Sequence, residues 1–220
     1  MEHGDAAPTS RRAVLASLGG LPGMAIAGCL DRASNGFELT EGFEDGLEGW
    51  EREADVPDDP NNPGETVAWS IDRSTDQAAS GEFSLAYDLD GRQDDGTIWV
   101  VTDLEVEPDR RYDARMSAMA WSESESFNTL AYLVMYLGPN RPTDEESFPG
   151  PNENSTGQGW DIGGLREPLN RAEGWERYEF TWRTPRTSTG ILYVAIGVTV
   201  VWETQIRYFV DDVSVVLESR

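Results

Sequence analysis

From Phe37 to its end the sequence is filled by short stretches in which apolar and polar residues alternate, separated by Gly, Pro, Asn and Asp. A period of two residues is typical of a β-strand with one buried face, and no interval has a convincing helical period. Strands are predicted at 37–43, 67–72, 82–88, 96–104, 111–121, 129–137, 175–183, 190–201 and 206–217. This succession predicts an all-β fold, an antiparallel β-sandwich or jelly roll.

Two intervals lack the strand pattern. Residues 53–65 are rich in Pro and Asp and are predicted to be a loop. Residues 138–174 are predicted to be a much longer connection with almost no strand pattern. Loops of that length in a compact domain are usually functional or disordered. No internal repeat is evident, so residues 37–220 are expected to form a single domain.

The first 28 residues have the pattern of an export signal. Arg11 and Arg12 lie in a stretch that resembles the twin-arginine motif. The apolar stretch 13–27 that follows is too short to span a bilayer on its own, since about 20 residues are needed. Removing residues 1–28 also removes His3, the only histidine, and leaves the net charge unchanged.

The signal ends in Ile-Ala-Gly-Cys, which resembles a lipobox with Cys29 as the residue that receives lipid. Cys29 is the only cysteine of the chain. The alternative is that Cys29 is incidental and an ordinary peptidase cleaves nearby. We expect export by the twin-arginine route, anchoring on the outer face of the cytoplasmic membrane through the N-terminal lipid, and a short tether over residues 29–36.

The charge balance is strongly acidic. The chain has 41 Asp and Glu residues against 17 basic ones, a net charge of −24, and every basic residue is Arg. Acidic residues spread along a folded chain without Lys are typical of proteins from extreme halophiles. An acidic tail for a basic partner would need one block of charge, which the sequence lacks. Nucleic acid is excluded as a partner, because phosphate contacts need clustered cations.

Five short motifs occur in an order that resembles a known family. They are the F-E-D-G-x-x-x-W pattern from Phe43 to Trp50 and the segments 79–85, 106–112, 174–178 and 209–215. Over residues 37–218 this series resembles the jelly-roll carbohydrate-binding modules of the four/nine type, within the galactose-binding-like superfamily. The resemblance implies non-catalytic binding of a polysaccharide or another glycan.

The segment YFVDDVSVV, residues 208–216, has two adjacent carboxylates inside a predicted strand. Strict alternation would place Asp211 on the face of Phe209, Val213 and Val215, the core face. A buried carboxylate without compensation is costly, and a bound cation would relieve that cost. The alternatives are that Asp211 lies at a solvated strand start or pairs with an arginine such as Arg207.

The resemblance implies a structural calcium ion near the two ends of the domain. Its side-chain ligands would be Glu44 and Asp211, because calcium prefers carboxylate and carbonyl oxygens. Backbone carbonyls near Glu38, Gly81 or Glu82 would complete the coordination shell.

Aromatic residues are numerous, and aromatic rings are enriched in ligand sites. If Tyr112 faces the core, Trp121 and Arg115 look outward from a sheet. In the same way Tyr193 is predicted to point outward. Further candidates for a sugar cleft are Tyr132 and Tyr136, on one face of a segment that is apolar on both sides, and Trp160, in the long loop. The alternative is that each ring fills the core; Trp50 and Trp175 are assigned to packing.

The chemical inventory argues against an enzyme. Without histidine after residue 28, a Ser-His-Asp triad, a Cys-His pair and a His-ligated zinc site are unavailable. A pair of carboxylates could still serve a glycosidase. Asn154 fits the N-glycosylation acceptor pattern. Non-catalytic carbohydrate binding is therefore preferred, with a structural or adhesion protein of the envelope as the alternative and a glycan-active enzyme third.

Overall fold

The computed structural model describes residues 36–91, 96–155, 161–201 and 204–220. Their strands are Gly36–Glu41 (β1), Glu51–Asp55 (β2), Trp69–Ser74 (β3), Ser84–Gly91 (β4), Gly96–Glu105 (β5), Tyr112–Ser122 (β6), Ala131–Gly138 (β7), Gly163–Pro168 (β8), Gly174–Arg183 (β9), Ile191–Val200 (β10) and Thr204–Ser219 (β11). A short 3₁₀ helix, Glu145–Ser147 (η1), lies between β7 and β8.

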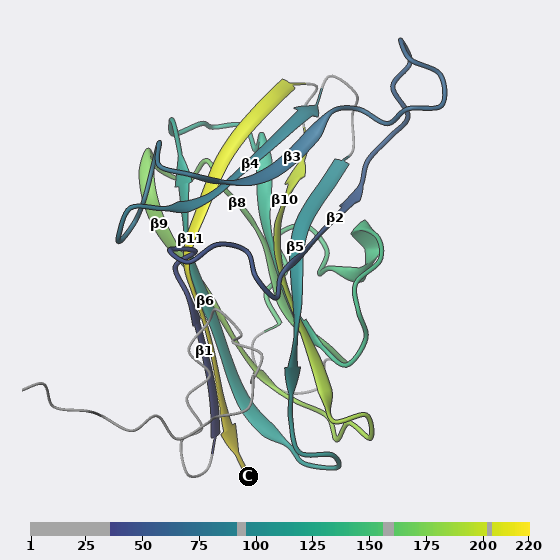
Figure 1. The fold of residues 1–220 in the computed structure, drawn as a ribbon, viewed down its shortest axis with the longest axis vertical. Coiled ribbons are helices and arrows are strands. Elements are labelled where there is room, and N and C mark those ends of the chain that lie inside the picture. Colours follow the sequence, from purple (N-terminus) through teal and green to yellow (C-terminus); the bar gives the residue numbers. More distant parts are fainter. Residues whose placement is uncertain (1–35, 92–95, 156–160, 202–203) are drawn as a thin grey trace, which may run out of the picture.

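The described strands form two antiparallel sheets that face each other (Figure 1). Sheet I has the order β3-β4-β11-β6-β9, with β1 also paired to β11, and sheet II has the order β2-β5-β10-β7-β8. From β4 onward the chain changes sheet at nearly every connection, which is the winding of a jelly roll. The predicted all-β sandwich is confirmed.

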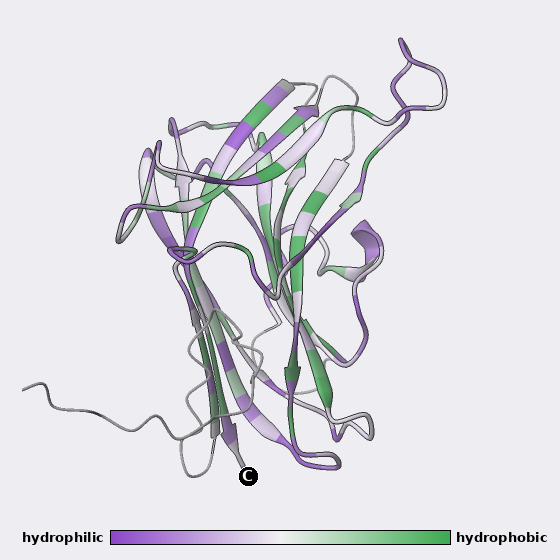
Figure 2. Cartoon of the chain, in the orientation of Figure 1, coloured by the Kyte–Doolittle hydropathy of each residue, from purple (hydrophilic) through white to green (hydrophobic). Residues whose placement is uncertain are grey.

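The main core lies between the sheets. Sheet I contributes inward residues such as Tyr87 and Val215, and sheet II contributes residues such as Ile98 and Val194. Hydrophobic and hydrophilic residues alternate along most strands, whereas β5 is largely hydrophobic (Figure 2). The first six residues of β5 are all buried, so sheet II is covered on both of its faces.

Two strands, β2 and β8, were not predicted. Each is the edge strand of sheet II, and edge strands need less apolar surface than central ones. Strand β2 is mostly charged, and β8 contains two glycines and a proline. The prediction of a loop over 53–65 is therefore wrong for 53–55. The prediction of a long connection with almost no strand pattern over 138–174 is also wrong, because this interval contains η1 and β8.

A β-bulge in β11 overturns the simple alternation predicted for YFVDDVSVV. The pairing with β6 shifts between Asp211 and Ser214, and Asp212 has a φ of 48°. Before the bulge, Phe209 and Asp211 pair with Trp121 and Met119, on the outer face of sheet I. After it, Val213 and Val215 lie in the core. The prediction that Asp211 shares the core face with Val213 is wrong, because the extra residue inverts the alternation.

The bulge also marks a change of neighbour along one edge of β11. Residues 204–210 pair with β4, whereas residues 213–218 pair with β1. On its other edge β11 pairs with β6 on both sides of the bulge. One long strand thus connects the N-terminal strand to the rest of sheet I.

The export signal, the lipobox with Cys29, most of the tether and Trp160 lie outside the described residues, and the expectations about them stay predictions. In the part of the chain that is described, no helix has the length and apolar character needed to cross a membrane.

The left-handed backbone at Asp212 leads to a stability prediction. Asp212→Val should lower the free energy of unfolding by about 1–3 kcal/mol, because a β-branched residue is strained at positive φ. Asp212→Asn should stay close to wild type, since Asn tolerates this conformation and retains an oxygen for Ser80 Oγ, which donates to Asp212 Oδ1 at 2.7 Å. Urea unfolding of both variants measures the difference, and equal stabilities would contradict a strained bulge.

Candidate functional site

The structure divides the predicted sugar-binding residues between two opposite surfaces. Trp121 and Arg115 lie on the outer face of sheet I, as predicted. Tyr193, Tyr132 and Tyr136 lie on the outer face of sheet II. A single cleft that contains all of them is therefore impossible, because the core separates the two faces.

On sheet I the outward residues of β6 and β9 form a continuous strip. Its members, here named the β6–β9 strip, are Arg115, Ser117, Met119, Trp121, Trp175, Arg177, Glu179 and Thr181. Arg177 Nη2 donates to Ser117 Oγ at 2.8 Å, and Arg177 Nε lies 3.4 Å from Glu179 Oε2. The strip therefore combines aromatic rings with hydrogen-bonding groups of both charges.

Three aromatic residues cross the top of this strip in one row. Trp121 on β6 pairs with Phe209 on β11 and with Trp175 on β9. The rings of Trp121 and Phe209 meet edge to face, with centroids 5.4 Å apart. Phe209 is buried, whereas both tryptophans are only half-buried. Their exposed surfaces provide an aromatic platform about two strands wide, or about 5 Å between backbones.

The platform includes a residue that the sequence analysis assigned to packing. Trp175 begins the outward alternation of β9, which continues with Arg177, Glu179 and Thr181. Trp175 has the same alternation as these polar residues, and this pattern in the sequence could have placed it on the outer face of the sheet. Phe127, which is fully exposed in the connection after β6, was also missed.

The lower end of the strip is hollowed. A depression of about 410 Å³ is lined by residues that include Arg115, Thr181, Arg183, Asp113 and Glu218. Arg183 Nε donates to Asp113 Oδ1 at 3.0 Å. Arg115 is exposed, and no hydrogen bond or ion pair of its side chain occurs within the described ranges. Its guanidinium is available to an oxygen-rich ligand.

On sheet II the predicted rings are less accessible. Tyr136 is 2% exposed and its hydroxyl donates to the carbonyl of Asn140 at 2.6 Å, while Tyr132 is 8% exposed. Tyr193 points outward as predicted and is half-buried. Residues 139–150, here named the strap, cover this face, and its Phe148 packs against Tyr136.

Asp211 is wholly buried, but on the outer face of sheet I, beneath the β3–β4 loop (residues 75–83). Its Oδ2 accepts hydrogen bonds from the backbone N–H groups of Ala79 and Ser80, at 2.8 and 3.1 Å. Its Oδ1 accepts one from the N–H of Asp212 at 2.7 Å. Burial raises the pKa of Asp211, and these donors act in the opposite direction.

Glu44 contacts the same loop by the same kind of bond. Its Oε1 accepts hydrogen bonds from the N–H groups of Glu82 and Phe83, at 3.0 and 2.9 Å. Gly81, with a φ of 63°, has no room for a side chain, since a Cβ atom there would lie 2.2 Å from Glu44 Oε1. Two carboxylates therefore clamp the β3–β4 loop to β11 and to the turn after β1.

The clamp does not fit a calcium shell. Calcium takes six to eight oxygens, whereas the loop presents N–H groups to both carboxylates. Within the described ranges no group of three or more acidic, His or Cys residues could hold a metal ion. Backbone donors thus compensate the buried carboxylate of Asp211 without a cation. A calcium ion here is an expectation from the resemblance alone, and the contacts of the described residues favour a clamp without metal.

Asp211→Ala should lower the free energy of unfolding by about 3 kcal/mol, because it leaves buried N–H groups without an acceptor. The wild type should melt at the same temperature with and without a calcium chelator. Asp76→Ala is the matched control, since it removes a carboxylate of the same loop that forms an exposed ion pair with Arg207, worth about 0–1 kcal/mol. Scanning calorimetry tests all three. Chelator-sensitive melting of the wild type, absent in Asp211→Ala, would establish calcium instead.

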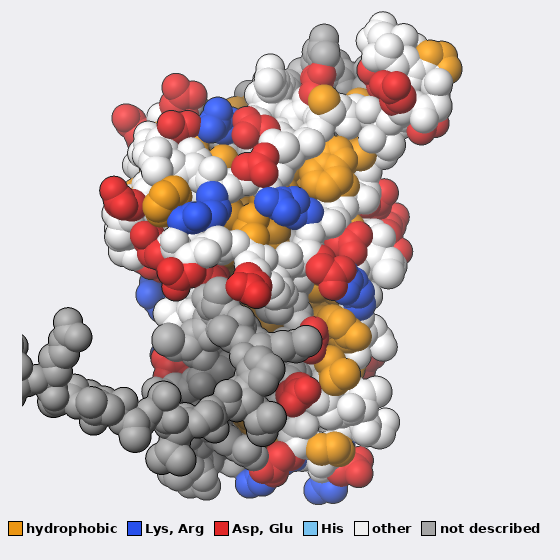
Figure 3. Space-filling view, viewed as in Figure 1, with side chains coloured by type: hydrophobic (Ala, Val, Ile, Leu, Met, Phe, Trp, Pro, Cys, Tyr) orange, Lys and Arg blue, Asp and Glu red, His pale blue; other side chains and the backbone are white. Residues whose placement is uncertain are grey.

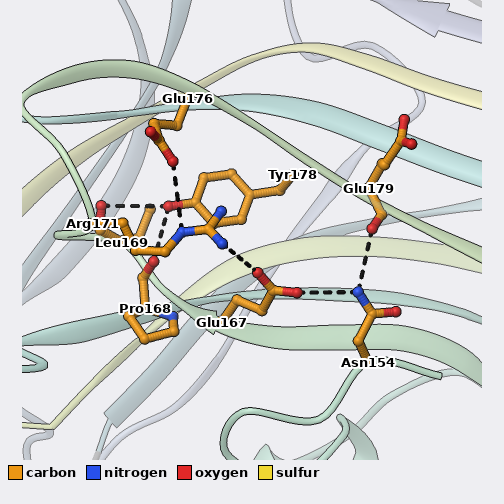
Figure 4. A network of polar contacts seen from close by, with 8 residues as sticks. All are labelled: Asn154, Glu167, Pro168, Leu169, Arg171, Glu176, Tyr178 and Glu179. Carbon is orange, nitrogen blue, oxygen red and sulfur yellow. Dashed lines mark hydrogen bonds and ion pairs between the residues drawn. The ribbon is translucent and has the colours of Figure 1, made fainter. Parts of the chain in front are cut away.

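Asn154, the predicted glycosylation acceptor, is not freely exposed. Asn154 forms an isolated β-bridge with Leu165 of β8. Its Nδ2 donates to Glu167 Oε1 at 3.0 Å and to the carbonyl of Glu179 at 3.3 Å. Figure 4 shows this amide joined by dashed contacts through Glu167 to Arg171, whose guanidinium lies over the Tyr178 ring, 4.4 Å from its centre. The nitrogen that would carry the glycan is therefore bonded within the fold, and glycosylation of Asn154 stays a prediction.

Acidic side chains are dispersed over the visible surface, with arginines among them (Figure 3). No strongly basic strip suited to a phosphate backbone appears on that face.

No protein-family model and no curated protein matches the sequence. The similar solved structures include carbohydrate-binding modules. One is TmCBM61 in complex with β-1,4-galactotriose, with 13% identity over 80% of this chain and 93% of that chain and a TM-score of 0.46. Another is the CBM22-1 xylan-binding domain from Paenibacillus barcinonensis, with 14% identity, 83% and 94% coverage and a TM-score of 0.42.

A third similar structure is the K3 adhesin domain of Lys-gingipain from Porphyromonas gingivalis. It shows 16% identity over 81% of this chain and 96% of that chain, with a TM-score of 0.45. At such values the assignment of the sandwich rests on the strand pairing described above.

Proposed function

We propose that this protein binds carbohydrate without transforming it, and that the β6–β9 strip is its binding surface. The observation that carries the proposal is the pair of half-buried tryptophans, Trp121 and Trp175, side by side on adjacent strands. A sugar ring has an apolar face that packs on such rings and hydroxyl groups that need donors and acceptors. Arg177 and Glu179 stand directly below the platform on β9.

The extent of the strip favours an oligosaccharide over a single sugar. It runs from the tryptophans to the depression of about 410 Å³ around Arg115, a volume within the usual range of ligand sites of about 300–1,000 Å³. A chain of sugars could stack at one end and hydrogen-bond to Arg115 at the other. Binding without catalysis agrees with the absence of histidine after residue 28.

The proposal includes the location of the protein. We infer that it is exported by the twin-arginine route, anchored by lipid at Cys29 and adapted to high salt. The supporting observations are the paired Arg11 and Arg12, the single cysteine at the lipobox and the net charge of −24 without lysine. An anchored module would hold a glycan at the outer face of the cytoplasmic membrane.

Trp121→Ala and Trp175→Ala should each weaken glycan binding by about tenfold or more, because a stacking surface at the centre of a site carries much of its affinity. Tyr193→Ala, a half-buried aromatic on the opposite face, is the matched control and should bind the neutral β-1,4-galactotriose as the wild type does. Affinity electrophoresis and calorimetry in molar salt measure this, with β-1,4-galactotriose and xylan as the first probes. Absence of binding to every member of a polysaccharide panel would favour an envelope or adhesion role.

Cys29→Ser should release the protein from the membrane fraction into the medium, because the anchor is lost while the domain is unchanged. Fractionation of cells and mass spectrometry of the mature N-terminus test this. A wild-type protein that is already free in the medium and lacks lipid would refute the anchor.

A further inference from the structure

The outer face of sheet II is covered by the chain itself. The strap leaves β7 after Gly138 and reaches β2, where Arg141 pairs with Glu51 and Glu53 at 2.8 and 2.6 Å. Its helix η1 stands beside β5 and β2 in Figure 1. Phe148 follows this helix and meets Trp99 of β5 edge to face, with centroids 5.5 Å apart. The strap thus lies over a surface that is rich in aromatic residues.

At the centre of this contact the strap inserts a carboxylate. Glu145 Oε2 accepts a hydrogen bond from Thr97 Oγ1 at 2.7 Å, and Oε1 lies 2.8 Å from Arg166 Nη2. With side chains 24% and 10% exposed, Glu145 and Arg166 form the least exposed ion pair of the described residues. The Arg166 guanidinium lies 5.3 Å from the centre of the Tyr132 ring. A hydroxyl and a guanidinium therefore hold the carboxylate, and an aromatic ring lies near the guanidinium.

The covered face retains hydrogen-bonding capacity that the strap does not use. Trp99 Nε1 and Arg166 Nε are buried and have no hydrogen-bond partner among the described residues. The two residues are 1% and 8% exposed. A buried unsatisfied donor costs about 1–3 kcal/mol. Both residues belong to one row across the sheet, through Gly197 and Val134. This row has donors that an oxygen-rich ligand could satisfy.

The strap is attached by side chains. Among the described residues, no backbone-to-backbone hydrogen bond joins 139–150 to a strand; such bonds begin at Asn152, whose N–H donates to the carbonyl of Arg166 at 2.9 Å. The strap is held instead by its own side chains, among them Arg141, Glu145, Phe148 and the buried Pro142 and Pro149. Side chains of the sheet also bond to the Asn140 carbonyl and to the Glu145 N–H. The strap can open without breaking the strand ladder.

We propose that the outer face of sheet II is a second saccharide-binding face, selective for a uronic acid, and that Glu145 occupies the place of the sugar carboxylate while the strap is closed. When the strap opens, Arg166 and Thr97 are free to bind that carboxylate, since a guanidinium recognises carboxylates by paired hydrogen bonds. The rings of Trp99 and Tyr136, released from Phe148, then pack on the sugar.

The closed strap competes with the ligand, so the apparent affinity decreases as the fraction of molecules with an open strap decreases. Glu145→Gln, which removes the ion pair, should raise the affinity for trigalacturonate by about tenfold over wild type. Glu146→Gln, the matched control on the same helix, should leave it unchanged, because Glu146 is exposed. Calorimetry with the full chain measures both, and β-1,4-galactotriose should show no gain. Adding Arg166→Gln to Glu145→Gln should abolish the gain.

Phe148→Ala opens the strap by a second route and should raise trigalacturonate affinity in the same direction. Equal affinities of wild type, Glu145→Gln and Phe148→Ala for trigalacturonate would overturn the proposal, as would an equal gain for galactotriose. Trp121→Ala removes the platform on the opposite face and should leave trigalacturonate binding intact. The two proposed sites can therefore fail independently.

Discussion

The hydrogen bonds between the Asp211 carboxylate and three backbone N–H groups are the interaction on which sheet I depends. They hold the β3–β4 loop over a bulge in the strand that contacts β1, β4 and β6. Because both oxygens of this carboxylate accept hydrogen bonds, the fold can bury it. Without this carboxylate, backbone N–H groups would lack an acceptor at the point where the neighbour of β11 changes from β4 to β1. The N-terminal strand and the platform at Trp121 are both positioned by this one strand.

The fold was largely predictable from the sequence because most strands have one face in a shared core. The alternation in 111–121 and 190–201 correctly places Met116 and Val194 inward. It fails at Asp212, because a single inserted residue inverts every position after it, and no composition signal marks that residue. The edge strands β2 and β8 were missed because charged residues and glycines obscure the period of two.

The candidate site was predictable only in part. The alternation of residues along the strands predicts that Trp121, Arg115 and Tyr193 point away from the core, and the structure confirms this. The alternation does not say to which sheet each strand belongs, so residues on opposite faces were grouped together. Tyr132 and Tyr136 were ambiguous because β7 is buried on both faces. The covering strap is mostly polar, and its contacts with sheet II depend on long-range side-chain pairs that have no local pattern.

The position of β1 has a consequence for how an anchored molecule would stand on a membrane. Gly36, the first residue of β1, pairs with Glu218 near the end of β11, whereas Trp121 pairs with Phe209. Along β11 these two positions are separated by about 30 Å at roughly 3.3 Å per residue. A lipid attached a few residues before β1 would therefore lie near the opposite end of β6 and β11 from the tryptophan platform, which would be raised above the lipid surface.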